Sequence, residues 1–154
     1  MLCSFFLLFF RFSLALYVQD IRYPYLCLSH RPPPSANITK TIAEAIAEGA
    51  GVEAVSITEE PELGEYVDIL FLGGAPYANI MAPQLREYAE RLSADKAGRI
   101  VLFTTSNWSR RTVRALRKIF TEKGILTDRK YFYAHMTRIK ARSEAAKAFA
   151  KTVL

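Results

Sequence analysis

The sequence predicts a doubly wound α/β domain, with a five-stranded parallel sheet in the order 2-1-3-4-5 and helices on both faces. Two observations support this class. Short apolar runs rich in β-favouring side chains alternate with helical patterns of ten to thirteen residues, as successive right-handed βαβ crossovers require. One run, residues 67–72, is almost unbroken in its apolar character, which is typical of a central strand covered on both faces.

The first strand and helix are expected between Tyr25 and residue 51. A strand is predicted from Tyr25 onward, and the prolines at 32–34 then fix φ and remove amide donors, so the connection should be an exposed, stiff loop. A helix is predicted to begin near Asn37 and to end at the Gly-Ala-Gly of residues 49–51. Apolar residues recur there at helical spacing, at Ile38, Ile42, Ala45 and Ile46.

The remaining elements continue the same alternation. Residues 52–57 alternate in polarity and predict a second strand, while short apolar runs predict strands at 99–104 and 131–134. Apolar side chains at i, i+3 and i+4 spacing predict three more helices. These are residues 83–93 with Pro83 in the first turn, residues 111–123 ending at Gly124, and residues 143–153.

The segment that follows the central strand is the best candidate for a ligand site. Gly73 and Gly74 should end the strand with two residues free to take positive φ, and Ala75-Pro76 should continue a tight loop. Tyr77 then stands at the rim. In an open α/β sheet, ligands bind in the crevice beyond the carboxyl ends of the strands. The alternative is that the two glycines only turn the corner.

The N-terminal segment is interpreted as an apolar extension, residues 1–20, followed by the domain at 21–154. Arg11 interrupts the apolar run, which is too short on either side of that charge for a membrane span. Three interpretations stay open: a signal or anchor, a strand or helix added to the domain, and an extension that is not native to it. An altered start or shifted reading frame would account for the unusual composition of residues 1–34.

Composition excludes several kinds of site. Cys3 and Cys27 form no metal-binding motif, and His30 and His135 lie in no arrangement that indicates a nucleophilic triad, so we expect no metal site and no catalytic residue. The net charge is +6, and residues 105–154 contain 13 Lys and Arg against 3 Asp and Glu. This basic half could attract anionic partners, but no nucleic-acid motif is present, and no specific nucleic acid is expected.

Three segments resemble the flavodoxin family, specifically its small bacterial flavodoxin-like type. They are residues 39–48, residues 66–78 and residues 101–106, and the resemblance extends from Thr39 to the C-terminus. It implies a flavodoxin-like fold that binds FMN. In that family the loop after the first strand, with the pattern Ser/Thr-x-Thr-Gly-Asn-Thr, holds the FMN phosphate, and the loops after the third and fourth strands hold the isoalloxazine ring.

The resemblance implies cofactor-binding residues in all three loops. Tyr77 or Trp108 would stack on the ring, and the hydroxyls and amide after the fourth strand would donate to its pyrimidine edge. The full set is Ser35, Asn37, Thr39, Gly73, Gly74, Ala75, Pro76, Tyr77, Thr104, Thr105, Ser106, Asn107 and Trp108. With Ile38 as an insertion, Ser35, Ala36, Asn37 and Thr39 align with Thr-Gly-Asn-Thr, so alanine replaces the glycine.

Two functions are therefore carried forward. The first is an FMN-binding redox protein that transfers electrons through bound flavin to an unknown partner protein, as an electron carrier or a flavin-dependent reductase-like protein. The second is a flavodoxin-like module that has lost FMN and serves as an interaction or membrane-surface protein. The family's electron carriers are usually acidic, so the +6 charge argues against an ordinary shuttle. The expected location is the cytoplasm, with membrane contact through the N-terminal apolar stretch left open.

Overall fold

The structure is a computed structural model that describes residues 14–18, 34–58, 62–64, 66–77 and 80–154. Side chains are described within these ranges except at 14–18, 34–37, 77 and 139–140. The strands are β1 (Leu14–Val18), β2 (Ala54–Ser56), β3 (Val67–Gly74), β4 (Pro76–Tyr77), β5 (Ile80–Met81), β6 (Ala97–Ser106) and β7 (Thr127–His135). The helices are α1 (Pro34–Ala50), α2 (Pro83–Arg91), α3 (Arg111–Glu122) and α4 (Ile139–Val153).

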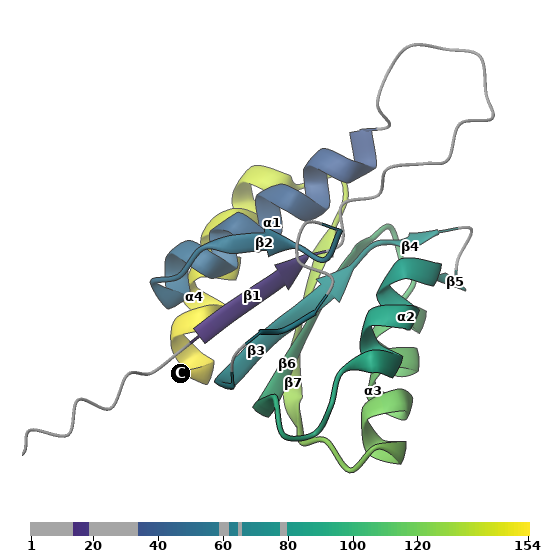
Figure 1. The fold of residues 1–154 in the computed structure, drawn as a ribbon. Coiled ribbons are helices and arrows are strands. Elements are labelled where there is room, and N and C mark those ends of the chain that lie inside the picture. Colours follow the sequence, from purple (N-terminus) through teal and green to yellow (C-terminus); the bar gives the residue numbers. More distant parts are fainter. Residues whose placement is uncertain (1–13, 19–33, 59–61, 65, 78–79) are drawn as a thin grey trace, which may run out of the picture.

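Five strands form one parallel sheet in the order β2-β1-β3-β6-β7, and β4 pairs with β5 as a small antiparallel hairpin. Helices α1 and α4 lie on one face of the sheet, and α2 and α3 lie on the other (Figure 1). This arrangement confirms the predicted α/β class with a parallel sheet. Because all five strands run in the same direction, their carboxyl ends meet at one edge.

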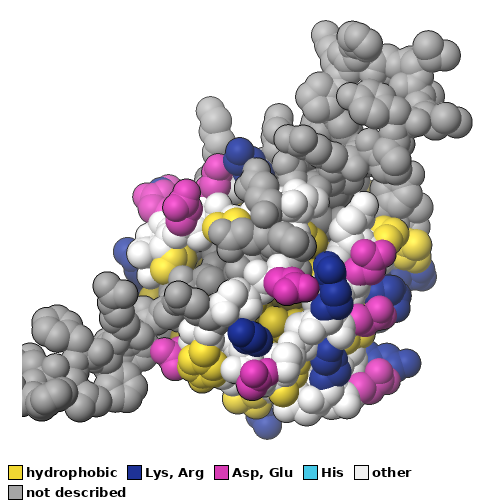
Figure 2. Space-filling view, in the orientation of Figure 1, with side chains coloured by type: hydrophobic (Ala, Val, Ile, Leu, Met, Phe, Trp, Pro, Cys, Tyr) yellow, Lys and Arg dark blue, Asp and Glu magenta, His cyan; other side chains and the backbone are white. Residues whose placement is uncertain are grey.

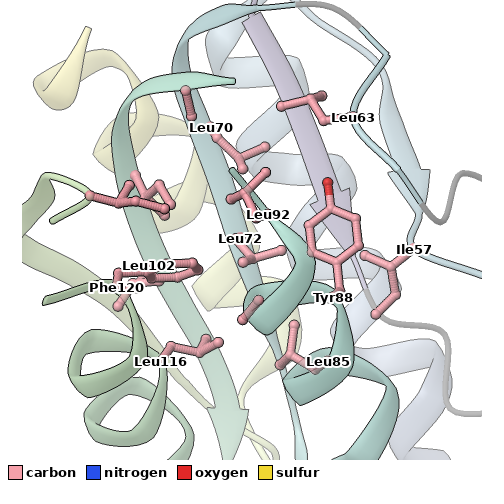
Figure 3. Packing of buried hydrophobic residues seen from close by; sticks show 14 of the residues in the cluster. Ile57, Leu63, Leu70, Leu72, Leu85, Tyr88, Leu92, Leu102, Leu116 and Phe120 are labelled. Carbon is pink, nitrogen blue, oxygen red and sulfur yellow. The ribbon is translucent and has the colours of Figure 1, made fainter. Parts of the chain in front are cut away.

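Two hydrophobic cores fill the spaces between the sheet and its helices. Side chains on neighbouring strand positions point to opposite faces, so Leu70 and Leu72 enter one core while Phe71, between them, enters the other. In the first core, leucines of β3 and β6 meet apolar side chains of α2 and α3 (Figure 3). In the second core, Phe71 and Phe103 pack with Ile42 and Ile46 of α1.

The first strand is not where the sequence analysis predicted it. The strand expected from Tyr25 onward lies outside the described residues. Instead β1, within the range 1–20 that was interpreted as an extension, lies between β2 and β3, which agrees with one of the three interpretations left open for this segment, a strand added to the domain. Its sequence, Leu-Ala-Leu-Tyr-Val, is uninterrupted by polar residues, as a strand buried between two layers of helices requires.

Several predicted boundaries are also corrected. Helix α1 begins at Pro34 rather than near Asn37, because proline is favourable in the first helical position, where no amide donor is needed. Helix α4 begins at Ile139 rather than at residue 143. The glycines that were predicted to end helices are confirmed, since Gly51 and Gly124 have φ of 74° and 69°.

Candidate functional site

The candidate site lies at the carboxyl edge of the sheet, where β3, β6 and β7 end beside one another. The register pairs Gly74 with Thr104 and Ser106 with His135. The β4–β5 hairpin, the loop 107–110 and the turn 136–138 extend beyond this edge. Loops from three neighbouring strands therefore converge in the place where ligands bind in open α/β sheets.

A hydrogen bond between two buried hydroxyls ties the start of α1 to the end of β6. Thr39 Oγ1 and Thr105 Oγ1 are 2.6 Å apart, and both residues are completely buried. The two threonines are separated by 66 positions in the sequence. The predicted phosphate segment and the predicted ring segment are thus brought together, but these two hydroxyls bind each other.

The glycines at the end of β3 have a different role from the one predicted. Neither takes positive φ, and both lie within the strand. A Cβ at Gly73 would overlap the backbone of Phe103, with 2.7 Å to its carbonyl carbon, so only glycine fits between β3 and β6. Gly74 O accepts a hydrogen bond of 2.9 Å from Thr104 Oγ1. This hydrogen bond joins the ends of β3 and β6, which form the base of the candidate site.

The next residues of the predicted ring loop are only partly accessible. Ala75 is buried, and Pro76 is half-buried at the start of the β4–β5 hairpin. The side chain of Tyr77 lies outside the described part of the chain, so its proposed stacking on a ring stays a prediction. The loop after β3 therefore offers backbone, rather than Ala75, to a ligand.

Strand β6 continues to Ser106, so Thr104, Thr105 and Ser106 belong to the strand and not to the predicted polar loop. Ser106 Oγ donates to Ser109 O at 2.6 Å. All three hydroxyls therefore have partners inside the protein, and they stabilise the edge. The expectation that they donate to a ring is unsupported by this geometry.

Tyr133 of β7 supports loop 107–110 through hydrogen bonds to its backbone. The phenol hydroxyl lies 3.0 Å from Ser106 O and 2.8 Å from Asn107 O, so it donates to the two carbonyls where the loop begins. The Arg110 guanidinium lies 5.5 Å from the centre of the Tyr133 ring, a cation–π distance. These contacts fix the loop although its outer side chains face solvent.

Among the predicted site residues whose side chains the structure describes, Asn107 and Trp108 are the exposed ones. Trp108 is 85% exposed, the largest exposed fraction among the exposed large hydrophobic side chains. Its ring meets His135 edge-on, with 5.8 Å between centroids and 74° between planes. His135 Nδ1 is in turn 2.9 Å from Thr137 Oγ1. An exposed aromatic side chain in contact with His135 thus stands at the carboxyl edge.

The sequence analysis missed Tyr133, His135 and Arg110 as members of this site. Tyr133 and His135 alternate along β7, but only the pairing of β7 with β6 shows that they lie beside Ser106. The arginine follows Trp108 closely in sequence, and the spacing alone did not indicate its contact with Tyr133. No local sequence signal distinguishes these residues from ordinary strand and helix-surface residues.

Two helices begin close to this edge with features that favour an anion. The first turn of α1 contains Ser35 and Asn37 and has no acidic residue. Helix α3 also lacks an acidic residue in its first turn, and the buried Thr112 Oγ1 there has no hydrogen-bond partner among the described residues. Free amides at a helix N-terminus attract negative charge. Among the described residues, no group of three or more His, Cys, Asp or Glu could hold a metal ion.

Comparisons with solved structures agree with this architecture. A flavodoxin from the domain Archaea superposes with a TM-score of 0.62 at 17% identity, covering 92% of this chain and 96% of that one. The chain has a flavodoxin-like fold. Oxidised flavodoxin 2 from Bacillus cereus gives a TM-score of 0.62 at 14% identity, covering 90% and 94%. The flavodoxin-like fold also matches Fusobacterium nucleatum flavodoxin bound to flavin mononucleotide, with a TM-score of 0.58, 12% identity, and coverage of 91% and 95%.

No protein-family model and no curated protein sequence matches the chain. The flavodoxin-like fold is thus recognised through structure, because the identities to the solved structures are between 12% and 17% for the three neighbours described above. Such a likeness shows the arrangement of strands and helices. The chemistry of the site has to be argued from this chain's own residues.

Proposed function

We propose that this protein binds FMN at the carboxyl edge of its sheet and serves as a redox protein. The observation that carries the proposal is the convergence of the start of α1 with the ends of β3 and β6, fixed by the hydrogen bond between Thr39 and Thr105. The same fold is seen in a flavodoxin bound to flavin mononucleotide. The convergence supplies one helix N-terminus and two strand-end loops around a common space.

The start of α1 fits a phosphate group. Its first turn contains no carboxylate, and the amides of residues 35–37 have no intrahelical acceptor, as in any first turn. The partial positive charge of a helix N-terminus stabilises a phosphate dianion without a counter-cation. Ser35 and Asn37 are proposed to contribute from the same turn, while Thr39, in the next turn of α1, binds Thr105 of β6.

The exposed part of loop 107–110 fits a flavin ring. Trp108 offers a flat, amphipathic surface, and Asn107 offers an amide to the polar edge of the ring. Tyr133 holds the backbone of this loop in place, so a ring would meet a preorganised surface. The proposed ring contacts are therefore Asn107, Trp108 and the backbone after β3, rather than the hydroxyls of β6.

Bound FMN supplies one- and two-electron transfer, and the chain needs no nucleophile for that chemistry. The residues of this chain bind and orient the cofactor. The floor made by Gly74, Thr104 and Thr105 closes the site on the sheet side. The loop with Trp108 leaves an exposed margin where a redox partner can approach.

A second function stays in competition, that of a flavodoxin-like interaction module without FMN. Two observations favour it: the hydroxyls of Thr104, Thr105 and Ser106 already have partners within the protein, and Ala36 aligns with a glycine of the family's phosphate pattern. No helix in the described ranges is long and apolar enough to cross a membrane.

The proposal is tested by titrating the cofactor-free protein with FMN and, separately, with riboflavin, which lacks the phosphate. Trp108→Ala should weaken both ligands by about 3- to 10-fold, the value of an aromatic contact. Leu126→Ala is the matched control, since Leu126 is also exposed but lies just before β7, at the opposite edge of the sheet. Equal losses in the two variants would remove Trp108 from the site.

The phosphate position has its own variant, Ala36→Asp. A carboxylate in the first turn of α1 favours the helix but repels a phosphate, so FMN affinity should fall about tenfold while riboflavin affinity stays unchanged. The neutral Ala36→Asn variant is the control for size and polarity. Loss of riboflavin binding, or an unchanged affinity for FMN, would contradict the assigned phosphate position.

A further inference from the structure

A basic rim at the carboxyl edge of the sheet combines Trp108 with four arginines from the segments that follow β6 and β7. We define it as Trp108, Arg110, Arg111, Arg114 and Arg138, all of which are exposed. The sequence contains no Asp or Glu from residue 105 to residue 121 or from residue 129 to residue 143, so no acidic side chain neutralises the rim from within its own two segments. The rim thus combines one aromatic side chain with four positive charges.

The arginines stand where helix stability disfavours them. Arg110 is the N-cap of α3 and Arg138 is the N-cap of α4, and neither cap makes a side-chain hydrogen bond to its helix. Neither helix has an acidic residue in its first turn. Cations at a helix N-terminus oppose the helix dipole, whereas anions stabilise it. Apart from the contact of Arg110 with the Tyr133 ring, the structure therefore gives no local stabilising role to the positive charges at these two helix starts.

The arginines of the rim also lack carboxylate partners within the described part of the chain. Other basic side chains have them: Arg86 lies 3.7 Å from Glu90, and Lys118 lies 3.8 Å from Glu122. On the face of the molecule that carries α2, basic and acidic side chains are interspersed (Figure 2). The charges of the rim are thus available to a partner of opposite sign.

We propose that this rim is the docking surface for an acidic electron-transfer protein, and this inference rests on the proposed redox function. Tryptophan and arginine are the side chains that most often dominate the energy of protein interfaces, and complementary charge accelerates encounter. Tyr133 and His135 hold the centre of the rim in place. A partner seated on the rim contacts loop 107–110, the same loop that is proposed to hold the flavin ring.

A protein fits this surface better than a nucleic acid does. The rim has one exposed aromatic side chain among its arginines, whereas surfaces for single-stranded nucleic acids offer several aromatic side chains on which successive bases stack. A tryptophan flanked by arginines is instead typical of the centre of a protein interface.

The test measures binding of an acidic two-iron ferredoxin by calorimetry, with both the FMN-loaded and the cofactor-free protein. Raising NaCl from about 20 mM to about 200 mM should weaken the complex at least tenfold, because screening acts on the charged rim. Arg114→Glu should weaken it about tenfold, and Trp108→Ala should do so by a similar factor in the cofactor-free protein, where the proposed contact of Trp108 with the flavin ring plays no part. Arg129→Glu is the matched control: Arg129 is exposed near the start of β7, away from the carboxyl edge, and its replacement should change the affinity less than about twofold.

Three results would overturn the proposal. One is an equal loss of ferredoxin affinity in Arg114→Glu and Arg129→Glu, which would show that binding depends on the net charge of the protein and not on the rim. Another is tighter binding of a basic cytochrome c, a DNA duplex or vesicles of anionic lipid than of the ferredoxin at the same salt concentration. The third is binding that salt leaves unchanged. Ferredoxin binding without FMN binding would contradict only the redox function, and FMN binding without ferredoxin binding would contradict only the rim.

Discussion

Arginine has opposite roles at the two ends of this sheet. At the amino edge, Arg99 forms an ion pair of 2.8 Å with Asp128 and also donates to the carbonyl of Val153 at the end of α4. Arg117 donates to the backbone carbonyls of Asp128 and Arg129. At the carboxyl edge, the arginines of the rim contact no carboxylate of the described chain. The same side chain therefore crosslinks the fold at one end and leaves charge available for a partner at the other.

The largest expected effect comes from breaking the amino-edge crosslink. Asp128→Ala removes the partner of the half-buried Arg99 and an acceptor that binds Lys130 N–H at 2.8 Å. We expect a loss of about 2 kcal/mol in the free energy of unfolding, measured by urea denaturation. Glu122→Ala is the control, because its ion pair with Lys118 is exposed and should contribute less than about 0.5 kcal/mol. Similar losses in the two variants would contradict the contrast between the edges.

The carboxyl edge should depend on hydroxyls instead of arginines. Thr39→Val leaves the buried Thr105 hydroxyl without its partner and should cost about 1–2 kcal/mol of unfolding free energy. The double variant Thr39→Val/Thr105→Val should lose less than the sum of the two single variants, as a double-mutant cycle can show. Thr121→Val, at an exposed position of α3, is the control. Additive losses would mean that the two hydroxyls are not coupled.

A smaller effect of opposite sign is expected at the rim. Arg111→Glu places an acid in the first turn of α3, so it should stabilise the protein by about 0.5 kcal/mol while it weakens ferredoxin binding. Arg91→Glu, in the last turn of α2, should instead destabilise the protein by a similar amount. The measurement is thermal unfolding of both variants. A lower unfolding temperature for Arg111→Glu would show that the positive charge of Arg111 stabilises the folded protein.

The smallest effect concerns Lys147, a cation that joins α4 to α1. Hydrogen bonding to Glu48 at 2.9 Å, and then to Glu144 at 3.3 Å, raises the pKa of Lys147 above its ordinary value of 10.5. Because the folded-state pKa is raised, the stabilisation is fully present below pH 10.5 and is lost as pH rises through the folded-state pKa. The stability difference between the natural protein and Lys147→Gln should therefore vanish above that pH. A difference that persists there would contradict the charged contact.

Much of the architecture could be predicted from the sequence because it depends on local periodicity. The apolar spacing in α1, α2 and α3 places their buried faces correctly, and the glycines at 51 and 124 end two helices as expected. The first strand could not be placed in the same way. Residues 14–18 and the run from Tyr25 both satisfy a strand pattern, and only pairing with β2 and β3 distinguishes the first of them.

The candidate site was harder to predict because its residues act through contacts distant in sequence. Gly73 is required by the backbone of Phe103, and the hydroxyl of Thr105 is occupied by Thr39. Neither of these two contacts can be inferred from residues that are close in the sequence. Trp108 was predicted because the family resemblance implies an aromatic side chain in the loop after the fourth strand, whereas its neighbour His135 becomes part of the site only through the register of β6 and β7.

The most direct test of the redox account is a single titration of the cofactor-free protein with FMN, read from two signals. Trp108 is the only tryptophan, so its emission reports the candidate site, while flavin fluorescence reports binding. We predict that both emissions fall together and give one dissociation constant below about 1 µM. A protein shown to be folded that leaves flavin fluorescence unchanged, or that quenches it without affecting Trp108, would contradict the account.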